Sequence, residues 1–322
     1  MHLAARNGQI GMVELLVSKG ASIEARNIYN YPPLYLAARS GHTGTVELLA
    51  RKGTLIDGVK KDNNTLLHYS ARDGDTDTVE LLLGRGALIN AVNDYHNTPL
   101  HHAAGNGHMN IVELLLTKGA LIEALDEDTQ TPMHLAASSD HTGVVDLLLG
   151  KGALIEAMGK RNNTPLHNAA MNDHTKVVEL LLGRGASIEA TEIGTMTPLH
   201  LAAFNGGTNI VELLLGKGAS TETMNTFNNT PLHLAASRGH TSAVELLLGR
   251  GAAIEAMNKD GYTPLHYAAT GGYTGVVELL LGRGASVKAM NKGNNTPVHL
   301  ATRKGHTDIV NLLNNKAPKT CP

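Results

Sequence analysis

A short motif recurs along this chain at an unbroken interval of 33 residues. One copy, NTPLHLAA, occupies residues 229–236, and its histidine marks the interval. The histidine positions are His2, His68, His101, His134, His167, His200, His233, His266 and His299, with Tyr35 in the one missing slot. A period of roughly 20–50 residues is typical of a stack of repeats, in which each unit packs only on its neighbours.

Composition also favours a stack over a single globular core. The chain has 322 residues, no Trp, two Phe and 35 Gly, whereas globular cores rely heavily on buried aromatic rings. A formal net charge of −2 argues against nucleic-acid binding by phosphate neutralisation. No run approaches the roughly 18 apolar residues of a membrane span, so no membrane insertion is expected. The one cysteine, Cys321, cannot form an internal disulfide, which favours a reducing, cytoplasmic location.

The repeat at residues 258–289 shows how a unit is expected to fold. Thr263 can cap a first helix with its hydroxyl, and Pro264 suits the first helical position because its missing N–H would be unpaired there anyway. Thr274 can cap a second helix rich in Val and Leu, and Gly284 can end that helix in a left-handed conformation. Two such short helices are unstable alone, so stacked copies must share a Leu, Val and Ala layer.

The combined motifs Thr-Pro-Leu-His-x-Ala-Ala, Gly-His-Thr, Val-Val-Glu-Leu-Leu-Leu and Gly-Ala resemble those of the ankyrin repeat family, over nearly all of the chain. The resemblance implies an all-α solenoid of stacked helix-turn-helix units with short β-hairpin-like arms. We expect ten repeats in residues 1–317 and a flexible tail at 318–322. The first repeat is truncated at its N-terminus, which suggests a piece of a longer protein.

The regular histidines admit a metal-binding and a structural interpretation. Equivalent residues of stacked helices lie roughly 8–10 Å apart, too far to share one ion. We therefore expect each histidine to hydrogen-bond near the Thr cap and to tie adjacent turns together, as the resemblance also implies. We expect no metal and no cofactor; the densest group, His101, His102 and His108, is the one candidate for a metal titration. The chain has no catalytic motif, so no enzymatic activity is expected.

The arm tips and the residues after the two alanines vary from repeat to repeat, and the resemblance implies that they line one concave groove where partners bind. The expected function is a non-enzymatic scaffold that binds a protein partner, as a monomer or within a longer chain. The alternative is an architectural spacer or a ligand-sensing repeat array within a larger multidomain protein. A spacer would not need large apolar residues at variable positions.

Those apolar residues gather in two places. The larger group comes from repeats 6 to 8 and contains Met171, Ile193, Met196, Phe204, Met224 and Phe227. A smaller group in repeat 2 contains Ile28, Tyr29 and Tyr31, and Tyr95 occupies the corresponding tip two repeats later. The polar rim is expected from Lys160, Arg161, Glu192, Asn229 and Arg238. Clustered apolar anchors within a polar rim are typical of protein-binding surfaces.

A further apolar row lies at the foot of the arms. It contains Met158, Met224, Met257 and Met290, continued by Val59, Val92 and Leu125. Packing between adjacent arms is slightly favoured over an adaptable, exposed stripe on the binding face.

Overall fold

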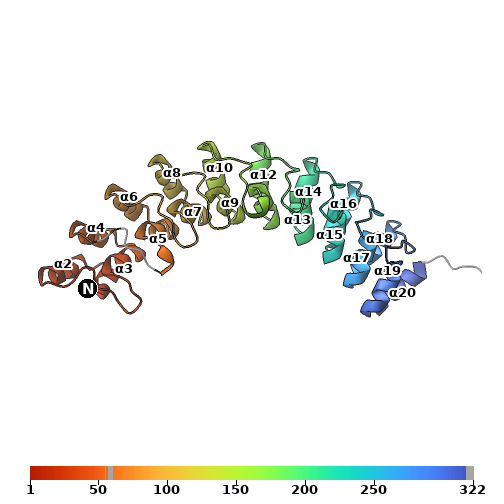
Figure 1. Cartoon of the computed structure of the whole chain (residues 1–322), viewed down its shortest axis with the longest axis horizontal. Helices are drawn as coiled ribbons and strands as arrows, with labels where there is room; N and C mark the ends of the chain where they lie inside the picture. Colours follow the sequence, from red (N-terminus) through yellow and green to blue (C-terminus); the bar gives the residue numbers. More distant parts are fainter. Residues whose placement is uncertain (55, 57–60, 317–322) are drawn as a thin grey trace, which may run out of the picture. The chain divides into compact units, whose positions relative to one another are not determined.

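A computed structural model describes residues 1–54, 56 and 61–316. Twenty α-helices and two short 3₁₀ turns make up the regular structure of this part, without any strand, which confirms an all-α solenoid of helix pairs (Figure 1). The arms between the pairs are therefore turns rather than strand pairs. The predicted tail at 318–322, together with Val59 and Cys321, lies outside the described residues.

The chain divides into two compact units, residues 1–160 and 161–322. The first contains α1 (His2–Arg6), α2 (Ile10–Ser18), α3 (Pro33–Arg39), α4 (Thr43–Arg51), α5 (Leu66–Asp73), α6 (Thr76–Gly84), α7 (Pro99–Gly105), α8 (Met109–Thr117), α9 (Pro132–Ser138) and α10 (Thr142–Gly150). The second contains α11 (Pro165–Met171), α12 (Thr175–Gly183), α13 (Pro198–Asn205), α14 (Thr208–Gly216), α15 (Pro231–Arg238), α16 (Thr241–Gly249), α17 (Pro264–Gly271), α18 (Thr274–Gly282), α19 (Pro297–Lys304) and α20 (Thr307–Lys316). The 3₁₀ turns are Lys61–Asn63 and Lys160–Asn162.

Within each unit the odd-numbered helices pack on one another in one layer, and the even-numbered helices form a second layer (Figure 1). The interior between the layers consists of small and branched aliphatic side chains. In α13 and α14, for example, Leu199, Ala202, Ala203, Val211 and Leu214 are all buried. The alanines let neighbouring odd-numbered helices approach closely, so the core needs no large aromatic residue.

The odd-numbered helices begin as the sequence predicts. Thr263 is the N-cap of α17, and its hydroxyl and the His266 side chain satisfy each other's backbone N–H groups in a capping box. The even-numbered helices differ, because α18 already includes Thr274 and its N-cap is Tyr273, with no side-chain cap. The prediction that Thr274 caps the second helix is therefore wrong. Gly284 adopts φ +92°, as a left-handed stop requires.

Candidate functional site

The regular histidines hold adjacent repeats together. At His200, Nδ1 accepts a hydrogen bond from the Thr197 backbone N–H at 3.2 Å, and Nε2 lies 3.1 Å from the Asn229 carbonyl oxygen. A ring nitrogen that accepts from a backbone N–H carries no proton, so the proton resides on Nε2 and is donated to the next arm. Burial lowers the pKa of His200 to about 4, which keeps the ring neutral. The structural interpretation of these histidines is confirmed.

The same arrangement recurs through both units. At five further histidines of this row the Nε2 atom lies within hydrogen-bonding distance of a carbonyl oxygen 29 residues later: His68 to Asn97, His101 to Gln130, His167 to Met196, His233 to Tyr262 and His266 to Asn295. A second histidine position uses Nε2 in the opposite direction, since His108 bonds the Arg72 carbonyl at 2.8 Å. In the described part of the chain, no group of three or more His, Cys, Asp or Glu side chains could hold a metal ion.

In several arms a buried polar residue at the base holds the tip in place, as Asn225 does. Asn225 accepts hydrogen bonds at its side-chain oxygen from the backbone N–H groups of Phe227, at 2.9 Å, and Asn229, at 3.0 Å. Its own N–H bonds the Asn229 carbonyl, and Asn228 turns the chain with φ +58°. The backbone groups of the tip are thus satisfied internally, which leaves the Phe227 side chain 64% exposed.

The larger apolar group, which we call the unit-2 patch, contains Met171, Ile193, Met196, Phe204, Met224 and Phe227. Its members Met171, Ile193, Met224 and Phe227 are exposed, while Met196 and Phe204 are half-buried. Contacts between repeats connect their backbones, because Asn205 Nδ2 donates to the Met171 carbonyl and the Thr226 N–H donates to the Gly194 carbonyl. The patch therefore combines helix ends and arm tips of neighbouring repeats.

The predicted polar rim is only partly present. Arg238 is exposed, and its guanidinium carbon lies 4.0 Å from the centre of the Phe204 ring. Arg161 is exposed and bonds Glu192, but the Glu192 side chain is buried. Asn229 is also buried, because its side-chain oxygen accepts from Asn258 at 3.0 Å. Glu192 and Asn229 were therefore wrongly assigned to the rim: both serve the arm interior.

Two further predictions concern Lys160 and the apolar row at the foot of the arms. Lys160, predicted as part of the polar rim, is exposed and pairs with Asp128 of the preceding arm. In the apolar row, Val92, Leu125 and Met158 are exposed in the first unit, and so are Met224, Met257 and Met290 in the second. Roughly half or more of each of these residues faces solvent, so they are not fully buried between adjacent arms, and packing between the arms stays a prediction.

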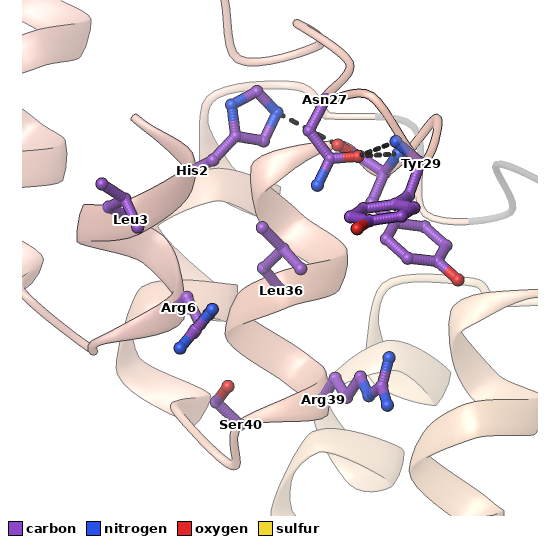
Figure 2. Close-up of a pocket in the computed structure, with 9 residues that line it drawn as sticks. His2, Leu3, Arg6, Asn27, Tyr29, Leu36, Arg39 and Ser40 are labelled. Atoms are coloured by element: carbon purple, nitrogen blue, oxygen red, sulfur yellow. Dashed lines mark hydrogen bonds between the residues drawn. The ribbon is translucent and has the colours of Figure 1, made fainter.

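Repeats 1 and 2 together form a pocket of about 560 Å³ that the sequence alone did not indicate. Tyr29 and Tyr31 line it, together with His2, Leu3, Arg6, Asn27, Leu36, Arg39 and Ser40 (Figure 2). Tyr95, the tip residue grouped with them in the prediction, is exposed but is not among these nine residues. A sequence signal for the pocket exists, since Arg6 and Arg39 are 33 residues apart and share one helix position.

A family model described as "Ankyrin repeats (3 copies)" matches the chain in overlapping segments, residues 1–93, 67–158, 121–192, 154–225, 199–291 and 232–321. A comparison with curated proteins returned no match. Among the helices of the described residues, none combines the length and apolar character needed to cross a bilayer.

Proposed function

Because the chain belongs to the ankyrin repeat family, whose members are generally protein-interaction modules, we propose that it is a non-enzymatic scaffold that binds a protein partner. The observation that carries this proposal is the unit-2 patch. Ile193 and Phe227 are each more than 60% exposed, and the hydrogen bonds that hold their arms involve backbone groups and arm-base residues rather than these two side chains. Exposed apolar groups gathered on a repeat surface usually serve binding.

The patch offers the features of a binding hot spot. Phe227 and Ile193 project from arms that the buried polar bases hold in place, so binding would require little ordering of the tips. Phe204 lies lower on α13 beneath the Arg238 guanidinium, which gives the patch a cationic edge. We propose that a partner inserts apolar side chains between the tips and the helix ends.

The test is a double substitution, Phe204→Ala with Phe227→Ala, assayed against a partner captured from the source organism and purified. Hot-spot residues contribute about 2 kcal/mol or more each, so the affinity should fall by about 4 kcal/mol. The matched control is Met257→Ala with Met290→Ala, which removes two exposed apolar side chains of the same unit outside the patch. Unchanged binding by the Phe double variant would favour an architectural spacer, or a contact elsewhere on the chain.

We also propose a reducing, cytoplasmic setting for this scaffold. The support is the sequence alone, in which Cys321 is the single cysteine. Labelling of that thiol in protein isolated from its source under alkylating conditions would test the idea, since an oxidised Cys321 would contradict it.

A further inference from the structure

The pocket at repeats 1 and 2 has chemistry unlike that of the unit-2 patch. Its helical side is formed by His2, Leu3 and Arg6 of α1 and by Leu36 and Arg39 of α3. The arm between the two repeats closes it from the other side. In Figure 2, Tyr29 lies above Leu36 and the two arginines lie below it. The pocket thus has an aromatic upper part and a cationic lower part.

The aromatic part is held rigidly. Asn27 Oδ1 accepts hydrogen bonds from the backbone N–H groups of Tyr29, at 3.0 Å, and Tyr31, at 2.9 Å. The Tyr31 ring stacks on Tyr35 with the ring centres 4.4 Å apart. His2 Nε2 lies 3.0 Å from the Tyr31 carbonyl. A ligand would therefore meet a preformed wall and would not have to order it.

Among the residues that the structure describes, the cationic part has no counter-ion. Arg6 and Arg39 are exposed, and in the described residues neither guanidinium forms an ion pair or a hydrogen bond. None of the nine residues that line the pocket is acidic. The next repeat shows the contrast, because Arg72 at the same helix position bonds Asp73 at 2.8 Å and lies over the Tyr69 ring. Repeat 3 thus supplies its own carboxylate next to the arginine, whereas Asn7 and Ser40 follow Arg6 and Arg39 in the described repeats 1 and 2.

The spacing of the two arginines restricts the ligand. They occupy equivalent positions on adjacent stacked helices, whose axes lie about 8–10 Å apart. A peptide in the polyproline II conformation advances 3.1 Å per residue with three residues per turn, so side chains three residues apart share one face about 9 Å from each other. Guanidinium groups bind carboxylates through paired hydrogen bonds. An acidic residue at every third position would therefore match both arginines.

We propose that repeats 1 and 2 bind an acidic peptide segment in an extended conformation, with carboxylates three residues apart on Arg6 and Arg39. An apolar side chain between the carboxylates contacts Tyr29 and Leu3, whose side chains are largely exposed. This site lies in the first unit and goes beyond the proposed apolar contact of the second. The partner for this pocket is thus a protein with an acidic, proline-compatible segment.

The experiment uses the full chain and short fluorescent peptides, with anisotropy as the readout at low salt. One peptide carries two Glu three residues apart around a Pro-Leu pair, a second carries them adjacent, and a third carries Gln at both positions. Each charge-assisted contact supports roughly a tenfold effect on affinity. We expect the three-residue spacing to bind about tenfold more tightly than the adjacent spacing, and the Gln peptide to bind least.

Variants locate the site. Arg6→Ala and Arg39→Ala should each lower the affinity for the peptide with Glu residues three positions apart about tenfold. Arg303→Ala is the control and should not lower it, although Arg303 occupies the same helix position in the last repeat. Because these side chains are exposed, circular dichroism should confirm that all three variants remain folded. The double variant Phe204→Ala with Phe227→Ala should bind the peptide normally, which separates this proposal from the proposed function. The proposal would be overturned if both Glu spacings bound equally well, or if the Arg303 variant lost as much affinity as the Arg6 and Arg39 variants. Tighter binding of a short oligonucleotide than of the peptide would also overturn it.

Discussion

One helix position carries arginine in repeats 1 to 3 and apolar residues in repeats 6 and 7. Arg6, Arg39 and Arg72 occupy it in the first unit, and Met171 and Phe204 occupy it in the second. The exchange leaves the scaffold intact because the position lies outside the buried layers. A repeat stack can thus present two surface chemistries on one framework, provided that the hydrogen bonds between repeats are the same in both regions.

Acid should produce the largest effect, because it acts on that shared framework in both units. Burial lowers the pKa values of His68 and His101 in the first unit and of His200, His233 and His266 in the second. These rings are neutral when folded but take up protons near pH 6.5 when unfolded. The free energy of unfolding is therefore highest above about pH 6.5, and it falls as the pH approaches the lowered pKa values that the histidines have in the folded protein.

For His200 alone the loss should reach about 3 kcal/mol between pH 6.5 and pH 4, since its pKa falls from 6.5 to about 4 when it is buried. Urea unfolding at pH 7.5 and pH 4.5 measures it. His200→Gln should reduce the acid sensitivity, while His96→Gln, at an exposed arm position, should not. An unfolding midpoint that does not move between these pH values would contradict the framework role of the histidines.

A second comparison concerns the close contact between a residue in a left-handed turn and the residue that packs over it. In the first unit His108 packs over Gly74, where an added Cβ would lie 2.7 Å from the imidazole. At one place in the second unit the glycine and the larger residue are exchanged: Asp173 takes the left-handed turn at φ +62°, and Gly207 packs over it, whereas Gly206 under His240 keeps the arrangement of Gly74 and His108. A Cβ on Gly207 would lie 2.7 Å from Asp173 Oδ1.

Gly207→His should therefore cost about 1–3 kcal/mol by overpacking. Adding Asp173→Gly should recover that cost, because it recreates the pairing of Gly74 with His108 and allows the new imidazole to reach a carbonyl of the preceding helix. A double-mutant cycle in urea measures the coupling, with Asp173→Gly alone as the control. Strict additivity of the two changes would show that the two positions do not compensate each other.

The sequence predicted the framework because its signals are local and repeated. The Thr cap, the following Pro and the histidine three residues after the cap lie within one turn of helix, so their contacts can be inferred from spacing. The second helices offered a false signal, since Thr274 is compatible with a cap but lies one residue inside α18. Two adjacent polar positions at a helix start cannot be told apart by residue type alone.

The candidate site was harder to predict because burial at the arms depends on contacts 29 to 31 residues apart. Asn229 looks like a surface residue, yet Asn258 of the next arm donates to it and buries it. The methionines at the arm feet show the reverse, since an apolar residue type suggests burial, yet roughly half or more of each residue is exposed. The arginine pair was visible in the sequence, but its significance depends on the absence of a neighbouring carboxylate among the described residues, which spacing alone does not reveal.

The smallest effect should come from two cations of the described residues that lie over aromatic rings, Arg72 on Tyr69 and Arg238 on Phe204. Such contacts contribute about 0.5–1 kcal/mol at exposed sites. Arg238→Ala should lower the free energy of unfolding by about that amount and should uncover the Phe204 ring, which raises the binding of an apolar dye. Arg72→Ala should have a similar effect on stability but should not increase dye binding, because Tyr69 belongs to a cluster of packed tyrosines. Arg238→Ala could instead leave dye binding unchanged and lower the affinity for the captured partner. The guanidinium itself would then contact the partner, and the unit-2 patch would be more cationic than its apolar residues suggest.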